Sequence, residues 1–284
     1  MLRATARRLS SDVGGDVVLG QHAWRSVRCR NAVTRPCSGR SRIDTRPPPP
    51  YPACSGSSQS DYAATKWALD YLDVRYVRDL LWPTWHTKQR QLFRELGAAG
   101  IKGTINVCDL QRYRAERGTW CDPNWAQLGS DPALRAFIDR FEGPNEPDLY
   151  SPFPGWPQAL REYMVWHEQK QTEAGMATTP LAGPTFTSPS AAATVGVLPQ
   201  ADLGAAHPYP ADNEPPESQR HGRDDFCAVT APGKPCQFTE VGYHSEINDP
   251  SSGNKGVDAG TRAAYTLRYL LESYRWGIDR TDLY

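Results

Sequence analysis

Two glutamates at the ends of predicted strands are the residues of this chain best suited to chemistry. Glu146 lies in FEGPNEPD (residues 141–148), and Glu240 follows 94 residues later in QFTEVGY (residues 237–243). Each glutamate closes a short, largely apolar run that is typical of a buried β-strand. Two carboxyl groups facing one bond can divide the work of breaking it: one gives a proton to the leaving oxygen while the other attacks the carbon. The pair therefore suggests acid–base and nucleophilic chemistry on a glycosidic bond.

Three further polar residues lie near predicted strand ends. His207 and Tyr209 alternate along one strand end, so their side chains point to the same side. An inward-facing Arg78 needs a carboxylate partner, because a guanidinium cannot lose its charge inside a protein. Each residue also has a structural interpretation: Arg78 could pair with Asp79 at the surface, and His207 could be a core residue bonded to a backbone carbonyl.

The elements that position these residues alternate along the chain. Apolar periodicity and capping residues predict helices separated by short strands, and this order is typical of a parallel sheet covered by helices. Seven strands are recognisable, and the predicted N-caps include Asp61 and Asp258. The helix starting at 258 is expected to bury an apolar face that includes Leu267, Leu271 and Tyr274. The expected helices are 61–72, 87–99, 131–138, 157–174 and 258–276, and the expected strands are 74–79, 101–107, 139–146, 179–184, 203–207, 237–241 and one starting at 282.

This order predicts an α/β fold of the (β/α)8 TIM-barrel type. The barrel is expected to be incomplete, because no strand is recognisable before the first helix and no helix follows the last strand. The G-x-G-x-x-G turn of dinucleotide-binding sheets is missing after the early strands. The G-x-S-x-G motif of serine hydrolases is also missing.

The composition divides the chain into two parts. Residues 1–58 are rich in Arg, Pro and Ser and predict a disordered leader, whereas residues 59–284 carry the barrel-like pattern. The leader has no uninterrupted apolar core of a secretory signal, and a transit peptide is a weaker interpretation.

The overall charge and the cysteines narrow the partners. Lys and Arg total 32 and Asp and Glu also total 32, which argues against a charge-driven nucleic-acid or membrane partner and suits a neutral ligand. Six scattered histidines and the lack of a Cys-x-x-Cys motif argue against a metal site. The pairs Cys108/Cys121 and Cys227/Cys236 could form short-loop disulfides or remain free thiols.

The motifs together resemble clan A retaining glycoside hydrolases, the cellulase- and xylosidase-like (β/α)8 barrels, over roughly residues 61–284. The resemblance implies that Glu146, preceded by the sugar-binding Asn145, is the general acid and base, and that Glu240 is the nucleophile. It further implies that Arg78 and Tyr209 contact the nucleophile. His207 joins the expected substrate-binding residues, and Trp82 and Tyr243 are candidates for stacking on a sugar.

From the resemblance we expect a glycosidase that hydrolyses O-glycosidic bonds in a neutral poly- or oligosaccharide by a retaining mechanism. It implies a carbohydrate substrate and a role in polysaccharide degradation, with no cofactor. It also implies a secreted, extracellular protein. The alternative is a catalytically impaired, truncated barrel that only binds carbohydrate, as a pseudoenzyme would.

Overall fold

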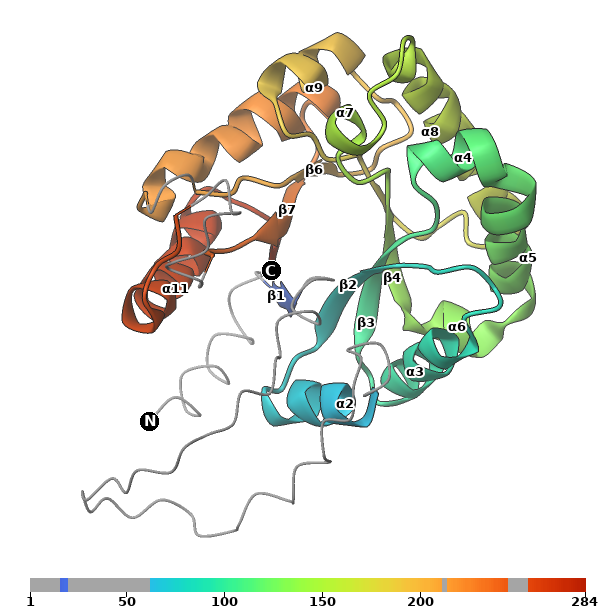
Figure 1. Cartoon of the computed structure of the whole chain (residues 1–284), viewed down its shortest axis with the longest axis horizontal. Coiled ribbons are helices and arrows are strands. Elements are labelled where there is room, and N and C mark those ends of the chain that lie inside the picture. Colours follow the sequence, from blue (N-terminus) through green and yellow to red (C-terminus); the bar gives the residue numbers. More distant parts are fainter. Residues whose placement is uncertain (1–15, 20–61, 211–213, 245–254) are drawn as a thin grey trace, which may run out of the picture.

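A computed structural model describes residues 16–19, 62–210, 214–244 and 255–284. Eight parallel strands form one sheet in the order β5-β4-β3-β2-β1-β8-β7-β6. The described helices lie around the outside of this sheet (Figure 1). The strands are β1 Asp16–Leu19, β2 Tyr76–Leu80, β3 Lys102–Asn106, β4 Ile138–Glu142, β5 Leu181–Ala182, β6 Gly204–Ala206, β7 Cys236–Val241 and β8 Arg280–Leu283.

The sheet curls into a barrel that is not fully closed, and one bridge connects its two edges. A single parallel bridge joins Ala182 of β5 to Leu203, the residue before β6. The Gly183 N–H donates to the Leu203 carbonyl over 2.8 Å beside this bridge. The predicted parallel α/β fold is therefore present, and its strands are arranged as in a TIM barrel, with the shortest pairing between β5 and β6.

The strand β1 differs from the sequence prediction. Asp16–Leu19 pairs with β2 on one side and β8 on the other, in the position where we expected a strand to be missing. Sequence reasoning missed it because four residues in an Arg-rich segment give almost no periodic signal. The connection between β1 and α2 is 42 residues long, which is also longer than ordinary connections between neighbouring elements. The other leader residues and Asp61 lie outside the described residues.

The helices match the prediction in part. The Asp258 carboxylate caps α11 by accepting from the N–H groups of Gly260 and Thr261, as predicted. The region 110–130 was not predicted to be helical, and it holds α4 and α5 behind the Asp109 cap. The helices are α2 Tyr62–Tyr71, α3 Thr87–Ala98, α4 Leu110–Glu116, α5 Asp122–Ser130, α6 Pro132–Phe137, α7 Pro147–Tyr150, α8 Trp156–Glu173, α9 Pro189–Val195, α10 Ala228–Thr230 and α11 Ala259–Arg275, with shorter turns η2 Arg117–Cys121, η3 Pro216–Arg220 and η4 Gly222–Cys227.

The buried face of α11 is not the one that the sequence predicted. Leu267, Leu271 and Tyr274 are more than half exposed, whereas Tyr269 and Ser273 are buried. Both faces of this helix carry apolar residues, so periodicity alone could not identify the face that packs on β7. Among the described helices, none combines the length and the hydropathy of a membrane-spanning segment.

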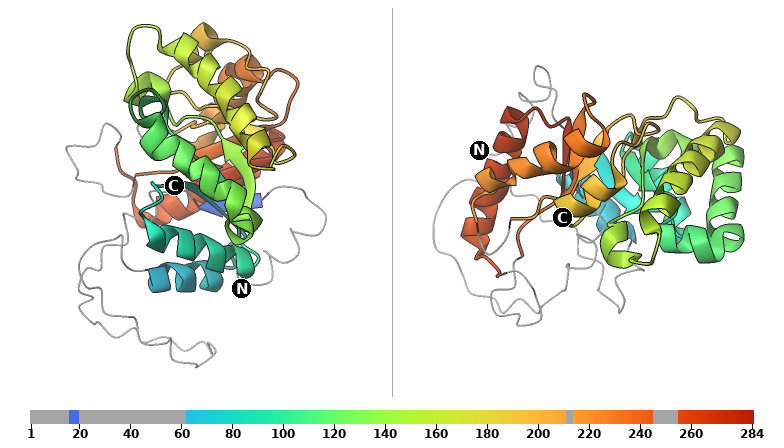
Figure 2. Two further views of the ribbon diagram at one scale, coloured as in Figure 1. Left: turned by 90° about the vertical axis from the view of Figure 1, so that its right-hand side faces the viewer. Right: turned by 90° about the horizontal axis from the view of Figure 1, so that it is seen from above.

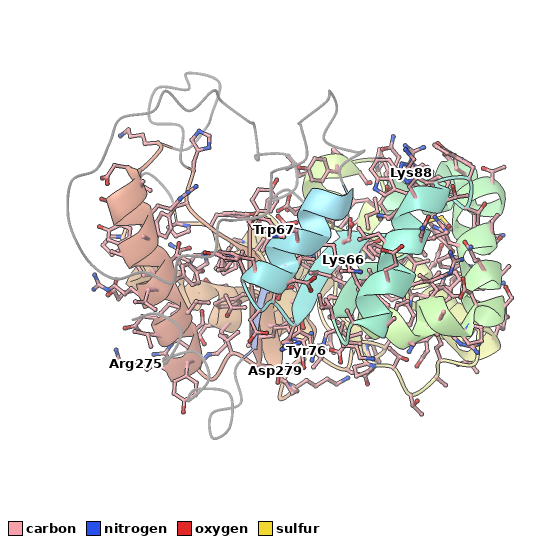
Figure 3. The ribbon with its side chains drawn as sticks, turned by 90° about the horizontal axis from the view of Figure 1, so that it is seen from below. Lys66, Trp67, Tyr76, Lys88, Arg275 and Asp279 are labelled. Carbon is pink, nitrogen blue, oxygen red and sulfur yellow. A yellow bond between two sulfur atoms is a disulfide. The ribbon has the colours of Figure 1, made fainter. Side chains whose placement is uncertain are left out.

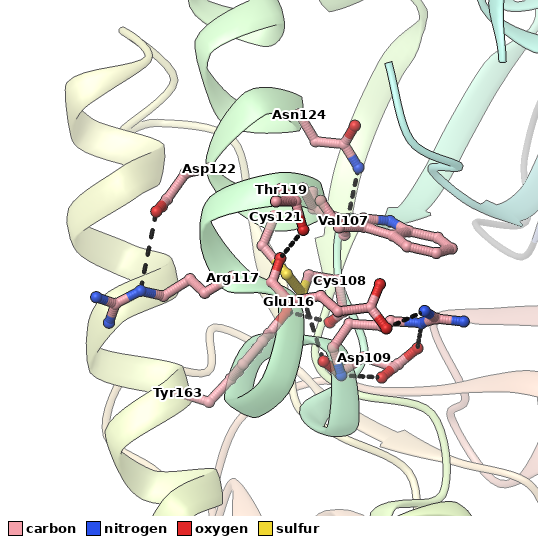
Figure 4. The surroundings of a disulfide bond; sticks show 12 residues. Val107, Cys108, Asp109, Glu116, Arg117, Thr119, Cys121, Asp122, Asn124 and Tyr163 are labelled. Carbon is pink, nitrogen blue, oxygen red and sulfur yellow. Dashed lines mark hydrogen bonds and ion pairs between the residues drawn. A yellow bond between two sulfur atoms is a disulfide. The ribbon is translucent and has the colours of Figure 1, made fainter. Parts of the chain in front are cut away.

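Both predicted cysteine pairs are joined. Cys108–Cys121 encloses α4 and η2, and Cys227–Cys236 joins η4 to the start of β7. The Tyr163 hydroxyl of α8 donates to the Cys108 carbonyl over 2.6 Å (Figure 4). The Cys108–Cys121 disulfide and the Tyr163 hydrogen bond hold the segment after β3 against α8, on the outside of the sheet (Figure 2).

Charged side chains occupy the end of the barrel at which the strands begin. Arg140 donates to Asp279 over 2.9 Å, and Arg280 pairs with Asp139 at the same distance. The Arg280 guanidinium also lies 3.9 Å from the centre of the Tyr76 ring. Figure 3 labels Tyr76 and Asp279 at this end of the molecule. Ion pairs therefore fill the barrel interior at the end where the strands begin. The carboxyl ends of the strands lie at the other end.

The position of β1 leads to a first prediction. Replacing Val18 with Pro removes a backbone N–H inside the sheet, so the variant should lose about 1–3 kcal/mol of unfolding free energy. Denaturant titration at constant pH measures this loss. The Val18→Ile control keeps the N–H and should unfold like the wild type. Equal midpoints for Val18→Pro and wild type would show that β1 does not belong to the sheet.

Candidate active site

Glu146 and Glu240 converge at the carboxyl ends of the strands. One carboxylate oxygen from each, together with a ring nitrogen of His207, lie within 4.8 Å of one another. The two glutamate side chains are 12% and 9% exposed, so both are accessible but mostly shielded from water. Glu146 follows β4, whereas Glu240 belongs to β7, and the curled sheet brings them together (Figure 1).

Glu146 occupies an unusual backbone conformation. Its φ of +41° lies in the left-handed region, which is costly for a residue other than glycine. The Glu146 N–H donates to the Thr185 hydroxyl over 3.2 Å, and Pro147 begins α7 directly afterwards. Upstream, Gly143 passes so close to β5 that a Cβ would lie 2.7 Å from the Pro184 nitrogen. The chain around Glu146 is thus fixed from both sides, which aims the carboxylate.

A bulge in β7 aims Glu240. Residues 238–241 of β7 span the same length as residues 281–283 of β8, so β7 contains one extra residue. Such a bulge redirects side chains and is common beside active sites. Both Thr239 and Glu240 consequently reach the same polar cluster, although neighbours on a regular strand point to opposite faces. Thr239 contacts His207, with 3.1 Å between the hydroxyl and Nε2.

Arg78 joins the acidic groups of the site. Its Nε donates to Glu142 over 2.5 Å, its Nη1 donates to Glu240, and its Nη2 donates to the Asn145 side-chain oxygen over 2.7 Å. Arg78 is 3% exposed, and Glu142 is fully buried. The inward orientation and the carboxylate partner expected for Arg78 are confirmed, and the surface interpretation is wrong.

The neighbours of Glu240 keep it ionised. Burial alone would raise the pKa of this carboxyl, but His207, Arg78 and the hydrogen bond from Tyr209 outweigh burial and lower the pKa to about 2. The Tyr209 hydroxyl donates to Glu240 Oε2 over 2.7 Å. Burial and the Glu240 charge raise the pKa of Tyr209 well above its ordinary value, so the phenol keeps its proton. A carboxylate in this environment is suited to nucleophilic attack.

His207 connects the two sides of the site. Its Nδ1 lies 2.8 Å from Glu146 Oε1, and its Nε2 contacts Thr239. In a neutral imidazole one nitrogen donates and the other accepts, so the tautomer sets the direction of both bonds. The core interpretation of His207, with a backbone carbonyl as its partner, is therefore wrong.

Two predicted residues lie apart from this cluster. Trp82 packs on Trp120, with ring centres 6.0 Å apart. The hydroxyl of Tyr243 donates to the Glu214 carbonyl over 3.0 Å, and its ring packs on Tyr265. Among the hydrogen bonds, ion pairs and ring contacts of the described residues, none joins Trp82 or Tyr243 to the two glutamates.

Sequence reasoning also missed two contributors. Glu142, two strand positions after Arg140, holds Arg78 by a buried ion pair. The signal was a charged residue at an inward position of a buried strand. Thr239 was not singled out, because only the bulge brings it to His207.

The cluster of Glu146, His207 and Glu240 is the group in the described part of the chain that could coordinate a metal ion. Its ligand atoms are already engaged, since Arg78 and Tyr209 bond the Glu240 oxygens and His207 bonds Glu146. A guanidinium against Glu240 also opposes a second cation electrostatically. The residues present fit a hydrogen-bonded carboxylate pair better than a metal centre.

Comparison with known proteins found similar solved structures but no matching sequence family. No protein-family description matches this sequence, and no curated protein matches it. Among solved structures, an active-site mutant of Rhizomucor miehei β-1,3-glucanosyltransferase in complex with laminaritriose is similar, with a TM-score of 0.58 and 12% identity. The alignment covers 78% of this chain and 80% of that protein.

A β-glucuronidase from Ruminococcus gnavus is also similar, with a TM-score of 0.54 and 12% identity. The alignment covers 78% of this chain but 39% of that enzyme, so the likeness concerns one part of a longer protein. At these identities the comparisons establish a shared fold, and both similar proteins are named for action on glycosides.

Arg78 generates the second prediction. The Arg78→Met variant leaves Glu142 and Glu240 buried without their cation, so its unfolding free energy at pH 7 should fall by about 3–5 kcal/mol. In the wild type the lowered pKa of Glu240 stabilises the fold above about pH 4.5, and this contribution is lost as the pH falls toward 2. The difference between variant and wild type should therefore shrink as the pH falls.

Denaturant titrations at pH 7 and pH 4 measure this difference. The Arg75→Met control removes an exposed arginine at the start of the same region and should change stability little. A difference between Arg78→Met and wild type that stays constant or grows on acidification would contradict the ion-pair account.

Proposed function

We propose that this chain is a retaining glycosidase that hydrolyses O-glycosidic bonds with Glu240 as nucleophile and Glu146 as general acid and base. The observation that carries the proposal is the approach of the two carboxylates to within 4.8 Å of each other in unlike environments. Retaining enzymes hold their carboxyl groups about 5–5.5 Å apart, whereas inverting enzymes leave about 6.5–9.5 Å for a water molecule. The spacing therefore favours retention.

In the first step, Glu240 attacks the anomeric carbon while the bond from that carbon to the leaving oxygen breaks. Glu146 gives its proton to that oxygen, and the sugar becomes covalently linked to Glu240. In the second step, Glu146 takes a proton from water, and the water oxygen attacks the same carbon and releases Glu240. The configuration at this carbon inverts twice and is retained.

The hydrogen bonds to Glu240 suit both steps. Arg78 and Tyr209 stabilise the carboxylate before attack and again as it leaves. Asn145, whose side-chain oxygen is held by Arg78, presents its amide nitrogen as a donor for the sugar 2-hydroxyl. His207 holds the Glu146 carboxyl in place through its Nδ1, which lies 2.8 Å from Glu146 Oε1.

The substrate proposal is a neutral poly- or oligosaccharide. The balanced charge supports it, as does the likeness to a β-1,3-glucanosyltransferase structure that contains laminaritriose. Two disulfides support an oxidising compartment, and with it the proposal of an extracellular protein.

The alternative is a carbohydrate-binding protein without activity. The sequence argument for it was a missing first strand, and β1 now occupies that position in the sheet. The second sequence argument was that no helix is recognisable after the last strand. The intact carboxylate pair favours the enzyme.

The third prediction tests the activity itself. The purified protein should hydrolyse at least one of the aryl β-glucosides or β-xylosides, or laminarin, and Glu240→Ala should lower kcat by at least about a thousandfold. Adding azide to Glu240→Ala should restore turnover, because the small anion can replace the missing carboxylate.

Proton NMR of the first-formed sugar tests retention, and chromatography of the products detects transfer to a second sugar in place of water. Wild type and Glu240→Ala that are both folded and equally inactive on the whole panel would refute the enzyme proposal. An inverted first product would refute the retaining mechanism alone.

A further inference from the structure

A hollow of about 220 Å³ opens among residues that follow strands β3 and β4. It lies between α4, which follows β3, and the segment after α7, which follows β4. Segments that follow strands in this fold lie at the same end of the barrel as the active site. The hollow equals several water volumes, enough for one sugar ring but too small for a whole oligosaccharide. Its lining residues are Gln111, Arg114, Tyr150, Ser151, Pro152 and Phe153.

Tyr150 ties the hollow to the active site. Its backbone N–H donates to the Glu146 carbonyl over 2.9 Å, so one turn of helix fixes the tyrosine relative to the acid. Partial burial and then the charges of Glu146 and Glu240 raise the pKa of the Tyr150 phenol.

The exposed ring of Tyr150 is available for stacking. Tyr150 is 61% exposed, although tyrosines usually bury most of their surface. The apolar face of a sugar ring packs well on an aromatic ring, and the tyrosine hydroxyl stays in contact with water. An exposed tyrosine beside a carboxylate pair thus fits a carbohydrate ligand.

Arg114 adds hydrogen-bond donors to the same hollow. Its guanidinium carbon lies 3.4 Å from the centre of the Phe153 ring, which holds it by a cation–π contact. Within residues 62–210, 214–244 and 255–284, no ion pair or side-chain hydrogen bond of Arg114 is seen. Several N–H groups of Arg114 are therefore available to sugar hydroxyls.

The frame around the hollow is held in place before any ligand arrives. The Cys108–Cys121 disulfide closes the loop that contains α4, and Tyr163 of α8 bonds the Cys108 carbonyl (Figure 4). A site that is already arranged loses little entropy on binding.

We propose that this hollow is a subsite for a second sugar ring of the substrate, stacked on Tyr150 and hydrogen-bonded by Arg114. The inference rests on the proposed function and makes it narrower. It assigns the substrate to oligo- or polysaccharides in which a neighbouring ring is recognised, as opposed to single sugars joined to a small non-sugar group.

The experiment separates binding from hydrolysis. In the Glu240→Gln background, calorimetry measures the affinity for laminaritriose, cellotriose and xylotriose and for the matching monosaccharides. Adding Tyr150→Ala or Arg114→Ala should weaken the best trisaccharide about tenfold and leave its monosaccharide within about twofold. Tyr150→Phe keeps the ring and should retain affinity. Leu149→Ala changes an exposed neighbour outside the lining and should have no effect.

The kinetic arm uses active protein. Tyr150→Ala should raise KM for an aryl trisaccharide about tenfold, and this loss should be much larger than the loss in kcat/KM for the aryl monosaccharide. Equal effects on both substrates, or no trisaccharide binding by folded protein, would overturn the subsite. Binding that depends on Tyr150 in a wild type that hydrolyses nothing would keep the subsite and refute the proposed function.

Discussion

The buried guanidinium of Arg78 is the constraint on which the site depends. It cannot lose its charge, so the fold must supply carboxylates around it. Glu142 from β4 and Glu240 from β7 do so, and the Asn145 side-chain oxygen accepts a hydrogen bond from Nη2. One side chain on β2 thereby links strands from across the sheet and fixes the ionised state of the proposed nucleophile.

The polar interior continues below Arg78. Asp282 of β8 is fully buried, and burial raises its pKa well above the ordinary value despite the opposing charges of Arg280 and Arg78. The ion pairs at the far end of the barrel then close the interior from below.

Backbone irregularities convert a regular sheet into a site. The bulge in β7 lets Thr239 and Glu240 join one polar cluster around His207, and the left-handed conformation of Glu146 turns its carboxylate toward this cluster. Neither feature has a simple sequence signal, because a bulge depends on the register of the partner strand. Strain of this kind is tolerated where surrounding contacts determine the geometry, which here come from Thr185 and Pro184.

The sequence predicted much of the fold and the centre of the site. Alternating strands and helices gave the parallel sheet, and strand-end residues gave the convergence of Glu146, Glu240, Arg78, His207 and Tyr209. The strand β1 escaped prediction because it is short and remote, and the exposed face of α11 was misassigned because apolar residues occur on both of its sides. Glu142 needed the three-dimensional pairing to reveal its role.

Trapping the covalent intermediate tests the central claim most directly. A 2-deoxy-2-fluoro sugar with a good leaving group should accumulate as an ester on the enzyme. Fluorine slows both the formation and the hydrolysis of this ester, and the good leaving group speeds only its formation. Peptide mass spectrometry of the labelled wild type should place one sugar on Glu240. A label on another residue, or none on folded protein that turns over the parent substrate, would contradict the account.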